Sequence, residues 1–474
     1  MSHRLAPSLC GLPQELIDKI SSQLDNPADL SNLSKTCKSM RQATINSLYE
    51  NITMLWKGDI YTSQQIENPR LDLLLRTLLE APELASRVLT ADLQATGLRA
   101  TMCRAVRPKL PAPICSTAQA DQVIVRLGLD GTETGNLLKA RLLENDFDAI
   151  LAVFVLSCPK LAHLTLGLDV LFANLFISTI LGAAPPPKSS KLTSEFQSLK
   201  TLKLGASFDP VIDAVVTYIG CPSEVAVGIP NLHTYSLLFY LPSLEHVEIS
   251  LPRPWPDVEF YWPTPAPPKL STLTSLRLLE STLEPETLQH ILLATPCLRR
   301  LQYDCRMFPA DVFDAGALET ALDAVKNTLV ELNVGGKFWS APLGEPLEAP
   351  YPRVRGSCSL RKMASLSTVS MPSCVLLGWD PASAPGLDGV LPPDIVGLRI
   401  QDDCAEYDGY AWSEERLVLQ IQDFVARERW KLVTPFLRSV DVSYGSWTDG
   451  EALRGLCARN GLTGCVGPAS LATP

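Results

Sequence analysis

The sequence predicts an α/β fold in which a small N-terminal helical bundle precedes an irregular solenoid of parallel strands. Three observations support this prediction. Short amphipathic helices fill the first fifty or so residues, an apolar string recurs through the rest of the chain, and helical segments separate several copies of that string. We therefore expect two parts, residues 1–52 and residues 53–474.

The first part is expected to contain short helices. Pro13 is suited to a helix start, where its missing N–H donor costs least, and Asn26-Pro27 starts a second stretch. The apolar residues recur at helical spacing in both stretches, as Leu16, Ile17, Ile20 and Leu24 and then as Leu30, Leu33, Cys37 and Met40. Helices this short cannot stand alone, so they pack on one another or on a partner.

Residues from about Leu9 to Asn51 resemble the F-box family. The resemblance lies in Leu-Pro-x-Glu-Leu from Leu12, in Asp29-Leu30, and in Leu-Ser-x-x-Cys-Lys-Ser from Leu33. It implies a helical domain that binds a Skp-type adaptor and, through it, a cullin. The residues that would form or support the adaptor-facing surface are Leu12, Pro13, Ile20, Leu24, Leu30, Leu33, Cys37 and Arg41.

Two positions depart from the F-box pattern. Met40 stands where an aromatic residue is often found, and Thr36 stands where an apolar residue usually precedes the cysteine. The alternative interpretation of these helices is an N-terminal cap on a larger repeat domain, which any solenoid requires.

The remaining residues repeat the string apolar-x-x-apolar-x-apolar, which is the strand pattern of leucine-rich repeats. Nine copies begin at Leu161, Leu199, Leu244, Leu273, Leu298, Leu329, Leu366, Ile395 and Leu437, and a degenerate tenth begins at Val88. Their mean spacing of about 35 residues exceeds that of regular repeats, so we expect irregular insertions. An ordinary α/β domain with repeated helix–strand units is the alternative.

Proline and helical patterns define the segments between strings. A proline lies two positions before four of the strings, at Pro159, Pro242, Pro296 and Pro435, where it ends a helix and favours extended backbone. Helices are predicted over residues 147–155 and 284–292. Loops are expected over residues 99–134, 183–191, 339–359 and 379–394.

Two aromatic segments are candidate contacts with a protein target. The first is a proline-rich stretch with Trp255, Phe260, Tyr261 and Trp262, and the second is an acidic stretch with Tyr407, Tyr410 and Trp412. Large aromatic side chains often dominate interface energy, and the carboxylates of the second stretch could receive a basic ligand. The alternatives are that the first stretch covers an end of the core and that the second is a solvated loop.

Composition and motifs exclude several classes of function. The formal net charge of −10 disfavours a nucleic-acid partner, and no run of about eighteen apolar residues predicts a membrane span. Thirteen cysteines without paired spacing fit reduced thiols in the cytoplasm or nucleus, where we expect the protein to act. No metal-ligand spacing, phosphate-binding loop or nucleophile motif is present, so we expect no cofactor, no metal and no catalytic activity.

The sequence therefore supports a substrate receptor of a ubiquitin ligase, with an F-box-like head for the adaptor and a repeat region for an unknown protein target. Two other hypotheses remain open. The chain could be a repeat scaffold that binds proteins without any ubiquitin role, or its α/β body could conceal a hydrolase site that only the fold would reveal.

Overall fold

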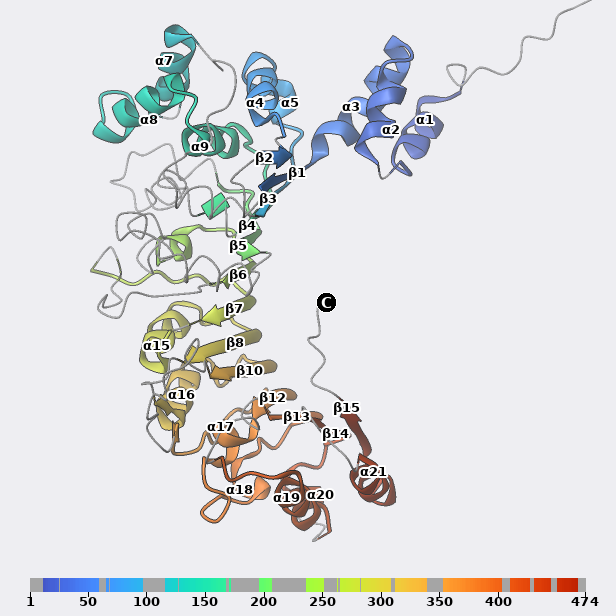
Figure 1. Ribbon diagram of the computed structural model, residues 1–474, viewed down its shortest axis with the longest axis vertical. Helices are drawn as coiled ribbons and strands as arrows, with labels where there is room; N and C mark the ends of the chain where they lie inside the picture. Colours follow the sequence, from blue (N-terminus) through green and yellow to red (C-terminus); the bar gives the residue numbers. More distant parts are fainter. Residues whose placement is uncertain are drawn as a thin grey trace, which may run out of the picture. The chain divides into compact units, whose positions relative to one another are not determined.

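The computed structural model describes most of the 474 residues, and Figure 1 shows its ribbon. The described residues are 12–24, 26–58, 65–67, 69–96, 116–126, 128–167, 170–171, 196–206, 236–250, 262, 265–281, 283–307, 312–338, 353–402, 410–426, 430–444 and 450–467. The chain divides into two compact units, Met1–Ser243 (unit 1) and Leu244–Pro474 (unit 2). The first described elements of unit 1 are helices, and both units contain parallel strands.

The N-terminal head consists of α1 (Gln14–Ser21), α2 (Pro27–Ser34) and α3 (Lys38–Glu50). Pro13 is the N-cap of α1, and the Asn26 side chain caps α2 by accepting a hydrogen bond from the Ala28 N–H, so both expected helix starts are confirmed. The second amphipathic stretch is divided, because Cys37 adopts extended backbone and its sulfur accepts a hydrogen bond from the Met40 N–H.

The strands of unit 1 begin directly after the head. They are β1 (Asn51–Gly58), β2 (Gln65–Glu67), β3 (Thr90–Thr96), β4 (His163–Gly167) and β5 (Thr201–Ala206), in the spatial order β5-β4-β3-β1-β2. Strand β2 pairs antiparallel with β1, whereas β1 with β3, β3 with β4 and β4 with β5 are parallel pairs. The 3-10 helix η3 (Leu237–Tyr240) follows later in the unit.

The helices of unit 1 fill the connections between these strands. They are α4 (Leu71–Glu80), α5 (Pro82–Ala85), α7 (Thr117–Arg126), α8 (Glu133–Leu143) and α9 (Phe147–Ser157). The predicted helix over residues 147–155 is confirmed as α9, in which every residue is buried and which Asp146 caps. The loop expected over residues 99–134 is wrong in part, since α7 and the start of α8 lie there.

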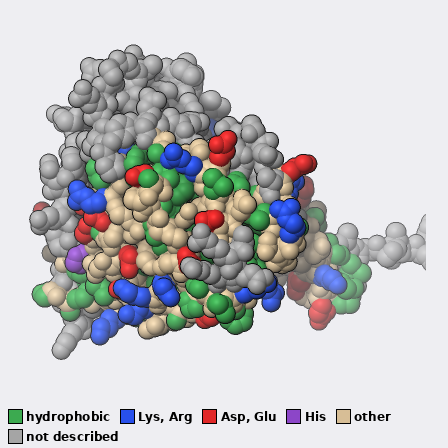
Figure 2. All heavy atoms as spheres, turned by 90° about the horizontal axis from the view of Figure 1, so that it is seen from below, with side chains coloured by type: hydrophobic (Ala, Val, Ile, Leu, Met, Phe, Trp, Pro, Cys, Tyr) green, Lys and Arg blue, Asp and Glu red, His purple; other side chains and the backbone are tan. Residues whose placement is uncertain are grey.

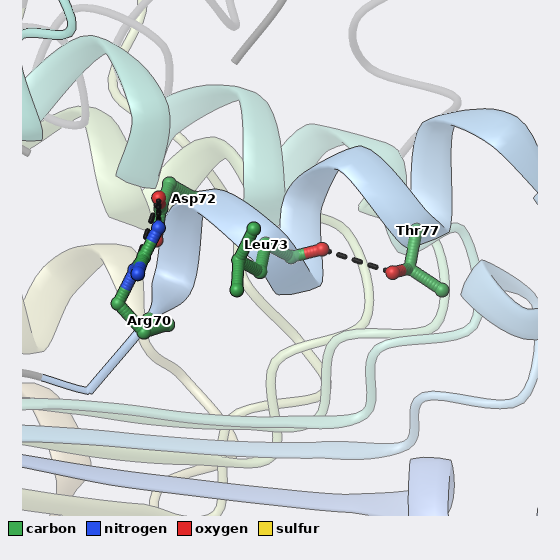
Figure 3. Close-up of polar contacts among 4 residues, drawn as sticks. All are labelled: Arg70, Asp72, Leu73 and Thr77. Atoms are coloured by element: carbon green, nitrogen blue, oxygen red, sulfur yellow. Dashed lines mark hydrogen bonds and ion pairs between the residues drawn. The ribbon is translucent and has the colours of Figure 1, made fainter. Parts of the chain in front are cut away.

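An ion pair fixes the start of α4 (Figure 3). The guanidinium of Arg70 donates hydrogen bonds to the carboxylate of Asp72, from Nε to Oδ1 at 2.9 Å and from Nη2 to Oδ2 at 2.6 Å. The hydrogen bonds from Arg70 hold the pKa of Asp72 below its usual range, and they outweigh the opposing effect of burial. The Asp72 side chain is almost fully buried in the first turn of the helix, where the helix dipole favours a negative charge.

We expect Asp72→Asn to lower the free energy of unfolding at neutral pH. Because the folded-state pKa of Asp72 is depressed, its contribution is present above the unfolded-state pKa, near 3.9, and is lost as the pH falls through the folded-state value. Denaturation of wild type and variant from neutral to acidic pH should therefore show two curves that converge at low pH. Glu133→Gln, at an exposed first-turn carboxylate of α8, is the control; a gap that persists in acid would contradict the assignment.

Unit 2 contains eight strands in one sheet among the described residues. They are β6 (His246–Ser250), β7 (Ser275–Ser281), β8 (Arg300–Met307), β10 (Glu331–Phe338), β12 (Thr368–Pro372), β13 (Gly397–Asp402), β14 (Ser439–Tyr444) and β15 (Thr463–Gly467). Neighbours in space follow chain order, and every adjacent pair is parallel. A second, two-stranded sheet pairs β9 (Phe313–Asp314) with β11 (Val354–Arg355).

Helices and turns connect the strands of unit 2. They are α15 (Pro285–Ala294), α16 (Ala315–Leu322), η4 (Asp323–Val325), α17 (Ser373–Leu377), α18 (Leu387–Val390), α19 (Glu414–Ala426), α20 (Trp430–Val433) and α21 (Gly450–Arg459). The predicted helix over residues 284–292 is confirmed as α15. Figure 1 shows α15 and α16 on one side of β7, β8 and β10. The loop expected over residues 379–394 contains the short α18, and the one expected over 339–359 contains β11.

Each of the ten apolar strings leads into a strand, and its apolar side chains are buried. Register aligns equivalent residues of neighbouring strands, so that Leu276 lies between Val247 and Leu301, and Leu332 lies between Leu301 and Val369. Tyr303 takes an apolar place in β8, and its hydroxyl donates to the carbonyl of Leu283. Stacked side chains thus form a continuous core that one helix–strand unit could not make alone.

A recurring hydrogen-bond pattern starts the parallel strands. The carbonyl of Arg299 accepts from the N–H groups of Val330 and Glu331, at 2.8 and 3.0 Å, and the carbonyl of Val330 accepts in the same way from Ser367 and Thr368. The four prolines predicted to precede strands all lie in turns, as expected for residues that end a helix.

No helix in the described ranges is long and apolar enough to span a bilayer.

Candidate functional site

The outer side of α1 carries large apolar side chains that face solvent. Leu16 and Ile20 are 48% and 39% exposed and lie one turn apart on α1, and Leu12, just before the N-cap Pro13, is 36% exposed; we call these three residues the α1 stripe. Ile17 and Ser21 lie on the buried side of α1. Three large exposed apolar side chains on and beside one short helix favour a surface that another protein covers.

A small core holds α1 in place. Ile17, Met40 and Ala43 are buried together, and Leu33 and Cys37 pack against them. Helix α3 packs on both α1 and α2, and Met40 is its innermost large side chain. Met40 therefore fills the interior of the head, although the sequence presents it only as a departure from the usual aromatic residue.

Thr36, the second departure from the F-box pattern, lies in the turn after α2. Its hydroxyl donates to the carbonyl of Leu33 at 2.8 Å, and the same carbonyl accepts from the Thr36 N–H at 3.1 Å at the end of α2. The side chain itself is exposed. A polar residue at this position thus fits the turn between α2 and α3.

The predicted adaptor-facing residues fall into three groups. Leu12, Pro13, Ile20 and Arg41 are exposed, and Leu24, Leu33 and Cys37 are half-buried. Leu30 is only 5% exposed, so it is a buried residue of the head. Sequence reasoning did not select Leu16, the most exposed member of the α1 stripe, although its spacing from Leu12 and Ile20 was visible.

Charged side chains flank the α1 stripe. Glu15, Asp18 and Lys19 are all exposed on α1, and the Gln14 side-chain amide donates to Asp18 Oδ1 at 2.7 Å. A surface with an apolar centre and a charged rim is typical of specific protein interfaces.

The candidate target-binding residues are only partly within the described structure. Trp255, Phe260, Tyr261 and Tyr407 lie outside the described residues, and Trp262 is half-buried. Their contact with a target stays a prediction.

Tyr410 and Trp412 pack against their own chain. The Tyr410 hydroxyl lies 2.6 Å from Ser373 Oγ, its ring meets that of Trp379 edge-on at 5.1 Å, and the buried Trp412 donates its indole N–H to the Gly378 carbonyl at 2.8 Å. Gly378 has a φ of 92°, a conformation that favours glycine. These contacts give Tyr410 and Trp412 an internal role at the end of α17.

Two observations on the described residues concern metal binding and thiol reactivity. Within the described ranges, no group of three or more His, Cys, Asp or Glu side chains is arranged to hold a metal ion. Burial raises the pKa of the Cys158 thiol to about 12, and it also raises the pKa of the Cys358 thiol, so both stay protonated at neutral pH. These two cysteines are core residues and not nucleophiles.

Comparison with known proteins identifies the head. The sequence has no significant match among curated proteins. Residues 9–54 match the F-box-like family, a range that contains α1, α2, α3 and the first residues of β1. The chain therefore carries an F-box-like domain at its N-terminus, formed by the three helices that present the α1 stripe.

Proposed function

We propose that the protein is the substrate-recognition subunit of a Skp–cullin–F-box ubiquitin ligase. The head would bind a Skp-type adaptor, and through it a cullin, while the remaining residues bind a protein target. The observation that carries this proposal is the F-box-like domain, whose first helix exposes the α1 stripe. F-box proteins are generally adaptors without catalytic activity of their own.

The repeated strands support the second half of the proposal. We infer that the strands form an irregular leucine-rich-repeat solenoid, because equivalent apolar residues recur and stack in register through unit 2. Such an array holds a target by its surface and needs no reactive group. Bringing the target beside a ubiquitin-charged enzyme raises its effective concentration, which is enough to promote transfer. We further propose that the protein acts in the cytoplasm or nucleus, where such a ligase would work.

Adaptor affinity tests the proposal. We expect the full chain to bind a purified Skp-type adaptor and the double variant Leu16→Asp, Ile20→Asp to bind at least about 100-fold more weakly. Each side chain would contribute about 1.5–3 kcal/mol when covered, and an aspartate in its place would be buried without a partner. Titration calorimetry or surface plasmon resonance measures the difference.

The matched control is Leu137→Asp with Leu143→Asp, which changes two exposed leucines of α8 in the same unit. This variant should keep wild-type affinity. If the wild-type chain fails to bind the adaptor, the alternative of a repeat scaffold without a ubiquitin role is favoured. Wild-type affinity in the α1 stripe variant would mean that the adaptor binds elsewhere on the head.

A further inference from the structure

The turns that lead into the strands of unit 2 carry an excess of positive charge. We call them the strand-start edge, and within the described structure they comprise residues 244–245, 265–274, 295–299, 326–330, 356–367, 391–396, 434–438 and 460–462. Their charged residues are Lys269, Arg299, Lys326, Arg361, Lys362 and Arg438 against Glu245 and Asp394. The edge therefore has a net charge of +4, although residues 244–474 contain 29 Asp and Glu against 20 Lys and Arg and carry −9.

Hydrogen bonds join these turns into a ladder. The carbonyl of the residue before one strand accepts from the N–H of its equivalent before the next, at 2.7 to 2.9 Å, in the series Arg299, Val330, Ser367, Val396 and Arg438. Neighbouring strands lie about 4.8 Å apart, so the ladder from β8 to β14 spans about 19 Å. About six residues of an extended polypeptide have this length. The edge is thus a fixed array that a short peptide segment could follow.

Three arginines of the strand-start edge are available to a partner. Arg299, Arg361 and Arg438 are all exposed, and no ion pair joins them to a carboxylate in the part of the chain that the structure describes. Lys362 differs, since its Nζ lies 3.5 Å from Glu319 Oε1. A guanidinium is always charged at physiological pH and presents a planar set of donors that matches a carboxylate. These three arginines can therefore bind carboxylates of another protein.

Phe436 adds a large apolar side chain to the strand-start edge. It lies three residues before β14, and the equivalent residues before β7, β8, β10, β12, β13 and β15 are Thr272, Cys297, Thr328, Ser365, Asp394 and Asn460. None of these is aromatic, so the turn itself does not require an aromatic side chain. Phe436 is nevertheless 56% exposed, and Leu432 of α20 and Val396 of the neighbouring turn are 86% and 37% exposed. Exposed apolar side chains beside cations favour a surface that a partner covers.

An acidic polypeptide fits the strand-start edge better than a nucleic acid does. Figure 2 shows several basic side chains among apolar ones along the lower border of the described surface. Carboxylates could bind the arginines of the edge while an apolar side chain covers Phe436. A phosphate backbone offers no such apolar group, and the remainder of unit 2, at −13 once the +4 of the edge is subtracted from −9, would repel it. A short acidic segment contacts only the edge, because charges more than about 10 Å away are largely screened.

We propose that the strand-start edge binds an acidic segment of the target protein, with its carboxylates on the arginines of the edge and an apolar side chain against Phe436. The inference deepens the proposed function by giving the chemistry of the target, and it rests on that function only in calling the bound polypeptide a target. It is supported by the net charge of +4, by exposed arginines without a carboxylate partner among the described residues, and by an exposed aromatic residue that the turn does not need. The strand spacing gives the segment a length of about six residues.

Selection from a random peptide library displayed on phage, against the full chain, tests this inference. We expect the selected peptides to be enriched in Asp and Glu with a Leu or Phe among them, and their affinity to fall as salt is added. Arg438→Glu and Arg299→Glu should each weaken the best peptide at least about tenfold. Phe436→Thr should also weaken it, and this variant should keep the fold because Thr272 and Thr328 hold the equivalent position before β7 and β10.

Arg416→Glu is the matched control, since it reverses the same charge at an exposed arginine of α19. Fluorescence polarisation of the labelled peptide should give wild-type affinity for this variant. The inference is overturned if no peptide is selected, if the peptides show no acidic preference, if Arg438→Glu and Arg416→Glu behave alike, or if a single-stranded oligonucleotide of equal charge binds more tightly than the peptide. Adaptor binding by the same preparation is measured separately. Its absence would contradict the proposed function alone, whereas loss of the acidic preference would contradict only this inference.

Discussion

Leu276→Ala is expected to destabilise unit 2 by about 3 kcal/mol, within the range of 2–5 kcal/mol for leucines in closely packed cores. Leu276 is fully buried in β7, and register places it between Val247 of β6 and Leu301 of β8. Truncation would leave a cavity that neither neighbouring strand can fill without losing its own register. Chemical denaturation of the full chain, followed by hydrogen exchange of the β7 amides, measures the loss.

Leu293→Ala provides the comparison for this effect. Leu293 lies in α15 of the same unit but is 60% exposed, so its truncation should change the free energy of unfolding by less than about 0.5 kcal/mol. Equal losses for the two variants would show that the in-register core does not stabilise the sheet as the structure indicates.

Met40→Ala is expected to destabilise the head by about 2–4 kcal/mol. Met40 of α3 is buried in a core with Ile17 of α1 and Ala43 of α3, against which Leu33 and Cys37 pack. A core this small has few other contacts to compensate for a cavity. We therefore expect faster proteolysis and faster amide exchange in α1, together with weaker adaptor binding.

Leu16→Ala separates the core of the head from its surface. Leu16 is on the same helix as Ile17 but faces solvent, so its truncation should leave amide exchange in α1 almost unchanged while it weakens the adaptor complex. Addition of excess adaptor should partly restore protection in Met40→Ala, because binding stabilises the folded head. If α1 exchanges at the wild-type rate in Met40→Ala, the core assignment is wrong.

Strong periodicity made most of the strands predictable. The ten strings coincide with strands β3 to β8, β10 and β12 to β14, because burial on one side imposes a fixed spacing of apolar residues. Strands β1 and β15 were missed. Tyr49, Ile52 and Met54 complete the string at β1 and could have revealed that strand, whereas β15 has Gly464 where its neighbour β14 has the apolar Val440. Pairing with β3 and β14 makes these segments strands.

The α7 helix was missed for a related reason. It lies in a region rich in proline and glycine punctuation, where local signals favour a loop. Helix α7 is stabilised by packing against α8 and by the ion pair between Lys139 and Asp121. Neither contact can be recognised from the local sequence of α7.

In helix α1 of the candidate site, some features could be predicted from the sequence and others only from the tertiary structure. The spacing of apolar residues in α1 made a helix and an F-box resemblance recognisable, but it could not say which apolar residues face outward. Ile17 turns inward because Met40 and Ala43 of α3 lie there, and Leu16 and Ile20 are consequently left in solvent. Leu30, which the resemblance assigned to the adaptor surface or its support, is buried.

The sequence by itself determined the F-box-like head and the positions of most strands, since each depends on local patterns. Only the tertiary structure decided that Met40 is a core residue, that the α1 stripe is exposed, and that Leu276 lies between Val247 and Leu301. These features depend on contacts between residues distant in sequence, such as the pairing of β7 with β8, and no local pattern specifies which strands or helices will meet.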